Sequence, residues 1–591
     1  MKTSLLKLTV LCTVLLCIGV SAKAQSIDEL LNGYYAHNRF MGSVMIKQGD
    51  KILFQKGYGY ADIANKVKND EKTIFNLASV SKTVTAVAIM KLHDEGKLNI
   101  YDRVDKYIPS FISDSTDKIT IINLLNHTSG MSANIGRVDE EGKGLVIPTN
   151  EPISMENLVD KFRSSKLKDK PGQKFEYNNY GYTLLAYIVE KVSGMDFPTY
   201  QQKEIFGKIG MPNSCYKLNL KDKSAIGYSG IGSQNFVEAK NEFHPSWIIG
   251  AAYNYSNTVD LTKYIDDVFS GKLFSEKTLK LMLDTCVSIG RSKRFWTLGW
   301  EKKTISGLTF YTHSGGDFGF ATRIGYLPEK NISIVVLSNL TKEIKFDDIF
   351  SANFAFVDEI TEKIIKILNG EQVTYLPIPN GQPNASIAGK YKFDDSHSAS
   401  IQISGNSLLL STELKDNFTI FDYTYYREIS DTSARYKICK EFAKAILSAN
   451  FEGFEQYASE QMKAGLFNPK GIAKINGGWK NYTSQSGQFK TFNICNKNDN
   501  SYSIAFHFEK AEIVMQLSFN GKDLIQGLFF QKVVPKCTVY NVSLIPVGND
   551  EFFVDGYTYG GYNDYRVKFD KNSNALYFKS ETEDFTAVKI D

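Results

Sequence analysis

The sequence predicts an α+β protein whose first 370 residues form one antiparallel sheet flanked by helices, followed by a smaller, strand-rich portion. Three observations support this fold class. Runs of alternating apolar and polar residues, typical of strands, lie near both ends of the first portion, and helical periodicity fills its middle. A segment with three prolines, residues 371–383, then predicts a stiff, extended linker. Aromatic residues make up 13% of the chain, which favours strands.

The start of the chain has the pattern of a secretory signal, residues 1–24. Lys2 and Lys7 form a charged start, and residues 8–20 form the apolar stretch that follows. Ala22-Lys23-Ala24 supplies a small-x-small cleavage site. No second apolar stretch of about 18 or more residues follows. We therefore expect an exported protein, periplasmic or extracellular after cleavage, with no membrane span in the mature chain. A retained N-terminal anchor is the alternative.

Charge and cysteine content exclude some functions. The net charge is +4, and three lysines of the predicted signal account for most of it. A nearly neutral mature chain argues against a nucleic-acid partner. The cysteines beyond the signal are odd in number and show no paired spacing, so we expect no disulfide framework, no metal site and no cofactor. Buried free thiols, with one bridge at most, are the simplest interpretation of Cys215, Cys286, Cys439, Cys495 and Cys537.

The elements of the first portion follow in order along the chain. Ser26, with Glu29 three residues later, forms a capping-box pattern that opens a short helix. A turn at Gln48-Gly49-Asp50 indicates a β-hairpin. With strands at both ends and helices between, we expect the first and last strands to become neighbours in the sheet. The expected strands are 42–47, 51–58, 308–313, 322–327 and 332–338, and the expected helices are 80–98, 119–125, 181–192, 258–269 and 350–368.

The strongest chemical signal is Ser79-Val80-Ser81-Lys82 at the start of a predicted helix. A serine hydroxyl attacks a carbonyl well only when a neighbour takes its proton. Residues i and i+3 share a helical face, so Lys82 can bring its amine beside the Ser79 hydroxyl. A buried lysine can lose its proton near neutral pH. Alone this pattern is weak, because a capping serine followed by a surface lysine is common.

Two other segments carry groups that suit the same chemistry. Residues Tyr177 to Asn179 follow a Pro-Gly pair and precede a helix, as expected for a loop that presents a phenol. Tyr177 could act as a general base and later as an acid, and Asn179 could donate its amide to a substrate carbonyl. Residues His313 to Gly316 end a predicted strand. An edge strand there could pair with an extended substrate, and the two glycines permit close approach.

Together these segments resemble the beta-lactamase-related serine hydrolases, near the class C beta-lactamases and the low-molecular-weight penicillin-binding enzymes. Their order and spacing fit, and so does a further block, Leu124 to Met131. The resemblance implies a class C beta-lactamase-like domain over residues 25–370. It also implies an oxyanion hole built from the backbone N–H groups of Ser79 and Gly316. The implied site residues are Ser79, Lys82 and Tyr177 for catalysis, and Asn179, His313, Gly315 and Gly316 for substrate and oxyanion binding.

The chain departs from the family pattern at His313. Relatives that act on penicillins or peptide carboxylates usually have Lys-Thr-Gly where this chain has His-Ser-Gly. Lysine is a cation at pH 7, whereas an unperturbed histidine is mostly neutral. Histidine at this position is common among esterases, D-amino-acid peptidases and amidases. It argues against a carboxylate contact and against efficient beta-lactam hydrolysis. His127, in the Leu124 to Met131 block, belongs to what is usually a structural turn in the family.

The portion after the linker shows weaker resemblances. Residues 384–435 and 536–591 resemble the two halves of a small lipocalin-like β-barrel. Between them, residues 436–535 resemble the cone-shaped α+β fold of the nuclear-transport-factor and cystatin-like superfamily. One domain would then be inserted in a loop of the other, and two consecutive domains are the alternative. No cluster of titratable residues indicates a second active site, so an accessory or spacer role is expected.

The sequence therefore predicts an exported serine hydrolase that cleaves an amide or ester bond through an acyl-serine intermediate. The expected substrate is a peptide, a D-amino-acid derivative or a small acyl ester, including fragments of the cell envelope. A penicillin-binding DD-peptidase or a weak beta-lactamase is one alternative. A binding or sensory protein of the envelope without catalysis is the alternative of a different class. Intact Ser79, Lys82 and Tyr177 argue against it, because a pure binder does not need all three.

Overall fold

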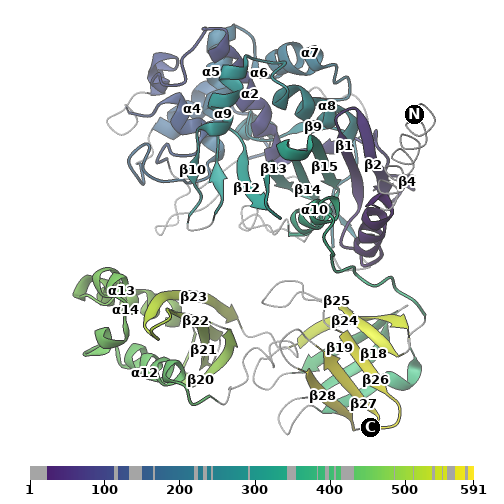
Figure 1. The fold of residues 1–591 in the computed structure, drawn as a ribbon, viewed down its shortest axis with the longest axis vertical. Coiled ribbons are helices and arrows are strands. Elements are labelled where there is room, and N and C mark those ends of the chain that lie inside the picture. The colour runs from purple at the N-terminus through teal and green to yellow at the C-terminus, as the bar shows by residue number, and fades with distance from the viewer. Residues whose placement is uncertain are drawn as a thin grey trace, which may run out of the picture. The chain divides into compact units, whose positions relative to one another are not determined.

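The structure is a computed structural model, and it divides into two compact units with the boundary between Ile378 and Pro379 (Figure 1). It describes residues 23–590, with gaps at 112–117, 132–148, 164–166, 218–223, 231–235, 241–243, 291–292, 342–354, 382–383, 393–397, 405–406, 414–430, 485, 499, 510, 536–538, 549, 556–565 and 580–583. The predicted signal, residues 1–24, falls almost entirely outside the described residues and stays a prediction.

The centre of the first unit is an eight-stranded antiparallel sheet in the order β10-β11-β12-β13-β14-β15-β1-β2. β1 pairs with β15 from Gly42 opposite Ser338, so the expected contact between the first and last strands is confirmed. The strands are β1 (Gly42–Gln48), β2 (Lys51–Tyr58), β10 (Val287–Ser288), β11 (Phe295–Trp296), β12 (Glu301–Ile305), β13 (Leu308–Asp317), β14 (Phe320–Leu327) and β15 (Ile332–Ser338).

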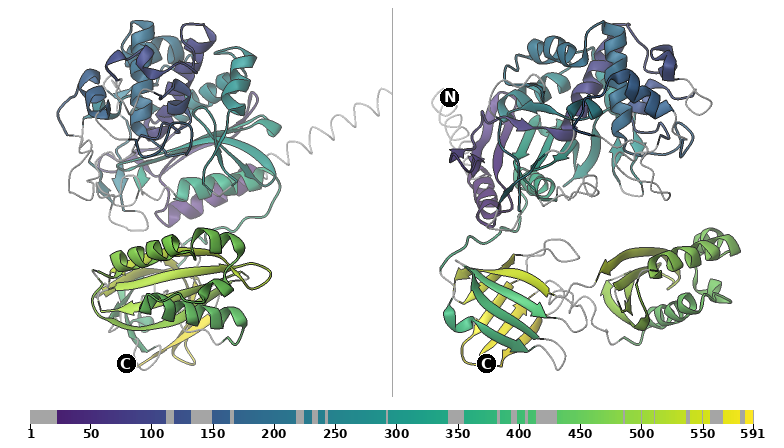
Figure 2. Two further views of the ribbon diagram at one scale, coloured as in Figure 1. Left: turned by 90° about the vertical axis from the view of Figure 1, so that its left-hand side faces the viewer. Right: turned by 180° about the vertical axis from the view of Figure 1, so that it is seen from behind.

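Helices cover both faces of this sheet (Figure 2). α8 (Thr258–Phe269) packs on β1, β14 and β15, and it matches the expected helix at 258–269. α10 (Ala355–Leu368) packs on β12, β14 and β15. Figure 2 shows α10 together with the helix over residues 23–36 on the face opposite α8, and the rings of Tyr34 and Phe356 join these two helices edge to face.

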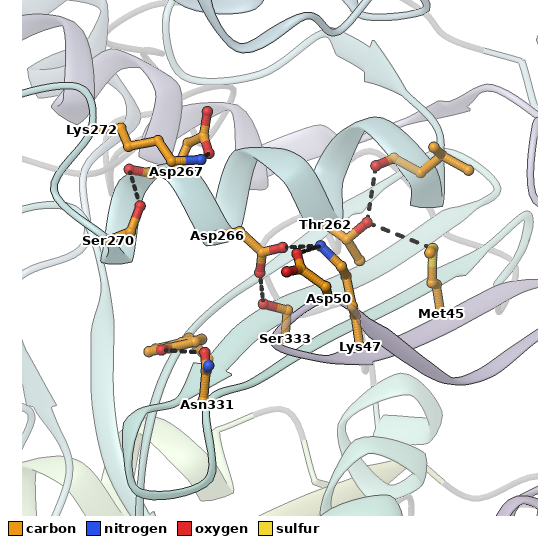
Figure 3. Close-up of polar contacts among 12 residues, drawn as sticks. Met45, Lys47, Asp50, Thr262, Asp266, Asp267, Ser270, Lys272, Asn331 and Ser333 are labelled. Carbon is orange, nitrogen blue, oxygen red and sulfur yellow. Dashed lines mark hydrogen bonds and ion pairs between the residues drawn. The ribbon is translucent and has the colours of Figure 1, made fainter.

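A single carboxylate fixes α8 to two strands of the sheet (Figure 3). Asp266 accepts a hydrogen bond from Lys47 Nζ of β1 at 2.7 Å and another from the Ser333 hydroxyl of β15 at 2.6 Å. About one turn earlier on the helix, the Thr262 hydroxyl lies 3.6 Å from Met45 Sδ of β1. Because β1 and β15 come from opposite ends of the unit, Asp266 helps to hold the sheet together where distant segments meet.

The helical region of the first unit is built around α2 (Ser81–Asp94). The sequence predicts one apolar face for this helix, but nearly every α2 residue is buried, because other helices surround it. The neighbours of α2 are α5 (Asn179–Ser193), α6 (Phe197–Gln201), the π-helix η4 (Gln202–Phe206) and α9 (Glu276–Asp284). Other elements here are the 3₁₀ turns η1 (Ala78–Val80), η2 (Val104–Lys106), η3 (Pro109–Phe111) and η6 (Pro245–Ile248), the helices α3 (Ile121–Leu125), α4 (Met155–Arg163) and α7 (Gly207–Ile209), and the strands β5 (Phe75–Asn76), β6 (Cys215–Tyr216) and β9 (Asn254–Ser256).

The second unit contains a closed eight-stranded barrel. Strands from both sides of an intervening segment close it: β19 pairs with β24, and β17 pairs with β28. Leu408 and Leu544 face each other across the first of these pairs and belong to the buried barrel core. The strands are β17 (Gly389–Lys392), β18 (Ser398–Ser404), β19 (Ser407–Glu413), β24 (Val539–Gly548), β25 (Glu551–Asp555), β26 (Arg566–Asp570), β27 (Ala575–Lys579) and β28 (Asp584–Lys589).

The segment between the two barrel halves has its own hydrophobic core. Its four-stranded antiparallel sheet is β20 (Phe489–Asn498), β21 (Ser501–Phe508), β22 (Ala511–Phe519) and β23 (Ile525–Pro535), and its helices are α12 (Ala434–Ser448), α13 (Glu460–Gly465) and α14 (Pro469–Thr483). The sequence pattern predicts a helix over 454–466, but the structure divides this segment, because extended Ala458 ends a 3₁₀ turn and Ser459 caps a new helix. Helix α14, capped by Asn468, was not expected.

Residues 371–380 form neither helix nor strand, as the prolines of the predicted linker indicate. Within the first unit, Leu376 is buried and the Pro377 carbonyl oxygen lies 2.6 Å from His37 Nε2. Within the second unit, the Asn380 N–H donates to the Pro546 carbonyl at 2.9 Å.

Two further expectations concern membrane insertion and thiols. Among the described residues, no helix combines the length and the apolar character needed to cross a bilayer. Cys215, Cys286 and Cys439 are not part of a disulfide. Only Cys439 is buried and Cys286 is exposed, so the expectation of buried thiols is wrong for Cys286. The side chain of Cys495 and all of Cys537 lie outside the described residues.

Candidate active site

The segment around Ser79 joins the sheet to the central helix α2. Ser79 lies in the 3₁₀ turn η1, directly before α2 and thus at the start of the helical segment as expected, and it is half-buried. Ala78 has a φ of 46°, a left-handed conformation that is strained for a residue with a Cβ. Leu77 holds the turn from both sides: its N–H donates to the Asn254 carbonyl at 2.8 Å, and its carbonyl accepts from the Thr322 hydroxyl at 2.9 Å.

Lys82 carries the amine that the sequence places beside Ser79. Its Nζ lies 3.1 Å from Ser79 Oγ, and it donates to the Ala251 carbonyl at 2.8 Å. The side chain is 0% exposed, and burial lowers the pKa of Lys82 well below its usual value. Desolvation disfavours the ammonium ion and so favours the neutral amine, which has a free electron pair. A neutral amine within hydrogen-bond distance of a hydroxyl can accept its proton.

Tyr177 lies next to both Ser79 and Lys82. Its phenol is hydrogen-bonded to the Ser79 side chain, and Lys82 Nζ lies 4.9 Å from the centre of its ring. Burial raises the pKa of Tyr177, and the hydrogen bond with Ser79 opposes this only in part. The phenol is therefore protonated at neutral pH, and the phenolate that would act as a base is disfavoured. Of the two groups that contact Ser79, the lysine is the better proton acceptor and the tyrosine the better donor.

His313 lies on β13 within an aromatic cluster next to this pair. It is 2% exposed, and its ring centre lies 5.1 Å from that of Trp296 and 6.4 Å from that of Tyr177. Burial lowers the pKa of His313 to about 3, so the ring is neutral. Its Nδ1 lies 2.6 Å from the Ser314 carbonyl, which requires the proton on Nδ1. The site thus has no cation where a lysine would stand in the Lys-Thr-Gly pattern.

The glycines that follow His313 allow β13 to approach the serine closely. A Cβ on Gly315 would lie 2.3 Å from the Leu77 carbonyl oxygen and 3.1 Å from the Ser79 backbone nitrogen. Only glycine fits between these atoms. Gly316 pairs with Ala321 on β14. The strand that carries Gly315 and Gly316 therefore lies against the backbone of the predicted nucleophile.

Asn179 is the first residue of α5, two positions after Tyr177. The preceding Asn178 caps this helix, because its side-chain oxygen accepts from the Gly181 N–H at 3.1 Å. Asn179 is buried, and its carbonyl accepts from the Thr183 hydroxyl at 3.4 Å. The structure thus brings Ser79, Lys82, Tyr177, His313 and Gly315 together by direct contacts, while Asn179 is placed near them by its position after Tyr177.

Two contributors to the site were not expected from the sequence. The Ala251 carbonyl that holds Lys82 is a backbone group from a distant loop, and nothing in the sequence around it signals this role. Asp317 accepts from the Asn76 amide at 2.7 Å, and Asn76 in turn accepts from the Ala78 N–H at 2.9 Å. Asn76 and Asp317 lie in the sequence close to Ser79 and directly after Gly316. That proximity was the only sequence signal that could have pointed to a role at the site. Burial raises the pKa of Asp317 to about 6.

The described residues include no group of three or more His, Cys, Asp or Glu side chains arranged to hold a metal ion. The chemistry that these contacts support is proton transfer around a serine hydroxyl. A sheet flanked by helices with a buried Ser-x-x-Lys pair between them defines a class of serine hydrolases. The chain belongs to the beta-lactamase family, whose profile matches residues 27–351.

Individual relatives agree with this assignment. Protein flp of Staphylococcus aureus (strain N315) is 32% identical over 330 residues, which cover 54% of this chain and 64% of the relative. The chain thus spans just under two thirds of that relative's length. A protein of Bacillus subtilis (strain 168) named as a penicillin-binding protein, PbpX, is 30% identical over 347 residues, which cover 58% of this chain and 79% of PbpX.

Two solved structures show the same fold at low identity. The octameric penicillin-binding protein homologue from Pyrococcus abyssi is 19% identical with a TM-score of 0.53, and the match covers 86% of this chain and 98% of that one. The D-amino acid amidase from Ochrobactrum anthropi SV3, solved with D-phenylalanine, is 19% identical with a TM-score of 0.51, covering 59% of this chain and 99% of that one.

Proposed function

We propose that the protein is an exported serine hydrolase that cleaves an amide or ester bond through an acyl intermediate on Ser79. One observation carries the proposal: the fully buried amine of Lys82 lies 3.1 Å from the Ser79 hydroxyl. A surface lysine after a capping serine would be exposed and charged. Burying an amine without a carboxylate partner is unfavourable, and such an arrangement is typical of catalytic sites.

The proton moves between three groups in this proposal. Lys82 accepts the Ser79 proton as the serine oxygen attacks the substrate carbonyl. The tetrahedral intermediate collapses when its bond to the leaving group breaks, and the Tyr177 phenol donates a proton to the departing oxygen or nitrogen. The Lys82 ammonium then returns its proton to Tyr177, directly or through the Ser79 oxygen. Water attacks the acyl-serine by the same route in reverse, which releases the acid and restores the serine.

The developing negative charge is stabilised by backbone N–H groups of Ser79 and Gly316. Support comes from Gly315, since its lack of a Cβ lets β13 lie directly beside the Ser79 backbone nitrogen. Backbone donors fixed in advance stabilise an oxyanion, and removing one typically costs about 10²–10³ in rate. The contact between Asp317 and Asn76 supports both sides of this hole, because Asp317 follows Gly316 and Asn76 holds the N–H of Ala78.

The neutral state of His313 bears on the substrate. With its pKa lowered to about 3, His313 offers no charge for a substrate carboxylate. We therefore favour a peptide, D-amino-acid derivative or small acyl ester without a carboxylate at that position. The D-amino acid amidase from Ochrobactrum anthropi shares the fold over 59% of this chain, and an amide substrate agrees with this preference. A DD-peptidase or weak beta-lactamase is the less favoured alternative.

The remaining parts of the proposal concern export and domain organisation. Residues 1–24 would direct export, so the substrate would lie outside the cytoplasm, with envelope fragments as candidates. We propose that residues 436–535 form a cone-like domain inserted in a barrel of residues 384–435 and 536–591. The pairing of β19 with β24 supports the insertion, because these strands flank the segment in the sequence and adjoin in the barrel. We propose an accessory role for both the cone-like domain and the barrel.

Intact-mass measurements test the proposal. The mature protein is incubated with a fluorophosphonate, with benzylpenicillin and with a p-nitrophenyl acyl ester, each beside the Ser79→Ala variant. We expect a fluorophosphonate adduct and ester turnover that both require Ser79, and weak or no acylation by benzylpenicillin. If the wild type gives no adduct and no turnover with all three reagents, the catalytic proposal fails and a binding protein becomes the better explanation.

A further inference from the structure

The loop that carries Tyr177 is hydrogen-bonded along its backbone to the turn at residues 126–131. This loop, residues 168–178, contains no helix or strand. Its backbone N–H groups instead donate to the turn: Lys168 to the Gly130 carbonyl at 2.8 Å, and Gly172 to the Thr128 carbonyl at 2.7 Å. A Cβ on Gly130 would lie 2.0 Å from the Asp169 carbonyl oxygen, so the two segments touch along their backbones.

His127 makes the two contacts of this series that flank Tyr177. Its carbonyl oxygen accepts from the Glu176 N–H at 2.8 Å, and its ring Nδ1 accepts from the Asn178 N–H at 3.1 Å. One residue thus binds the backbone immediately before and immediately after Tyr177. The ring also packs on the phenol, with the two ring centres 4.4 Å apart and the planes at 37°.

The surroundings of His127 keep the ring in this orientation. The side chain is 1% exposed, and it contacts Phe175, Tyr182 and Trp296 besides Tyr177. Because Nδ1 accepts a hydrogen bond, the neutral ring carries its proton on Nε2. Burial lowers the pKa of His127 well below its usual value, so Nδ1 stays an acceptor. The backbone of His127 has a φ of 58°, a strained conformation that must be maintained by its surroundings.

We propose that His127 is a positioning residue for Tyr177, and that its ring Nδ1 and carbonyl oxygen fix the phenol against Ser79. This inference rests on the proposed function, because it assumes that Tyr177 donates a proton to the leaving group. A purely structural turn needs the carbonyl contact and the packed ring, but it does not need an acceptor at the Nδ1 position beside Asn178. The position of that acceptor is therefore the property to test.

Two substitutions keep a polar side chain, but only one of them moves the acceptor. His127→Asn places its amide oxygen where Nδ1 lies, and asparagine also tolerates a positive φ. His127→Gln places its amide oxygen one bond further out, near the Nε2 position. If the Asn178 contact positions Tyr177, the asparagine variant retains the function of Tyr177 and the glutamine variant loses it. Tyr177→Phe supplies the profile expected for complete loss of the phenol.

The measurement compares a p-nitrophenyl ester with the ethyl ester of the same acyl group. The p-nitrophenolate ion leaves without a proton, whereas an ethoxide ion needs one, so loss of the proton donor affects the ethyl ester more. Misplacing a catalytic group by about 1 Å can cost about 10²-fold. For His127→Gln we expect kcat/KM to fall about 10²-fold with the ethyl ester and about tenfold or less with the p-nitrophenyl ester, as in Tyr177→Phe. His127→Asn should stay within a few fold of the wild type on both.

The concentration of active sites is set by fluorophosphonate titration, so a partly unfolded variant is not mistaken for a slow one. Equal rate losses on the two esters in His127→Gln, or equal losses in the glutamine and asparagine variants, would overturn the positioning role. So would a His127→Gln profile that differs from that of Tyr177→Phe. These outcomes are distinct from failure of the proposed function, in which the wild type itself forms no acyl-serine.

Discussion

Substitution of Lys82 tests which group removes the proton from Ser79. The amine is fully buried and lies 3.1 Å from the hydroxyl, within the reach of a general base. A positioned general base contributes about 10²–10⁴-fold to a rate. At about 1.4 kcal/mol for each factor of ten, this corresponds to about 3–5 kcal/mol of transition-state stabilisation. We expect Lys82→Met to slow acylation by this factor. Lys82→Arg should do the same, because a guanidinium ion does not lose its proton.

The same substitution has a predictable effect on stability. The pKa of Lys82 is lowered in the folded chain from the ordinary value of 10.5. Between the lowered folded pKa and 10.5, the unfolded chain therefore binds a proton at this lysine that the folded chain does not bind. By linkage, this residue makes the wild type more stable as the pH rises towards 10.5. Lys82→Met lacks this dependence. The difference in free energy of unfolding between the variant and the wild type should therefore favour the variant most at neutral pH and least in alkaline buffer.

The reaction of Ser79 with a fluorophosphonate, which phosphonylates the serine after the same proton removal, is followed by intact mass from about pH 5 to about pH 9, beside denaturant unfolding at both ends of the range. Lys91→Met is the matched control: Lys91 is on the same helix α2, but it pairs with Glu95 away from Ser79. It should acylate like the wild type. Acylation of Lys82→Arg within a few fold of the wild type would refute the role of a neutral amine, because the guanidinium cannot replace it.

Three further predictions follow from other parts of the structure. Gly315→Ala should lose acylation by about 10²–10³-fold and melt at a lower temperature, since the new Cβ would lie 2.3 Å from the Leu77 carbonyl oxygen; normal labelling by fluorophosphonate would contradict this. The pKa of Asp317 is raised to about 6 in the folded chain, so the folded chain keeps a proton that the unfolded chain has already released, and wild-type stability should fall by about 2 kcal/mol as the pH rises from about 4 to about 6. Denaturant titrations at these two pH values should show a smaller fall for Asp317→Asn, and an equal fall would show that another group is responsible. Finally, Glu413 and Val539 are directly paired in the barrel, so a short turn can replace residues 414–538. This variant should keep a folded barrel and an unchanged rate of Ser79 acylation. An unfolded barrel, detected by circular dichroism and limited proteolysis, would show that the insertion is not separable.

Elements that depend on local pattern could be predicted from the sequence. The helix at 258–269 agrees to the residue, because its N-cap, Asn257, directly precedes it and its amphipathic spacing runs through it. β13 is longer than the expected strand 308–313, since it continues through Gly315 and Gly316. Glycine usually weakens a strand, but here it lets β13 run past the backbone of Ser79. The local pattern contains no information on that contact.

In the candidate site too, contacts set by local spacing could be predicted from the sequence, whereas contacts set by tertiary folding could not. The contact between Ser79 and Lys82 is predictable because it depends on the three-residue spacing alone. Tyr177 and His313 could be placed beside them only through the family resemblance, since no property of their own segments fixes the distance. The Ala251 carbonyl that holds Lys82 could not be predicted at all, because it is a backbone atom brought in by tertiary folding. Helix α14 was missed because Gly477 and Gly478 interrupt its helical pattern.

The strain at the site explains why it depends on the whole unit. Ala78 and His127 both have left-handed backbone conformations, and each adjoins or holds a residue that contacts the reacting oxygen. Such conformations persist only where surrounding contacts determine them. For Ala78 these contacts come through Leu77 from Asn254 and Thr322, which belong to widely separated segments. The geometry around Ser79 is therefore complete only when the sheet and the helical region have both formed, and partial folding would leave the serine without its neighbours.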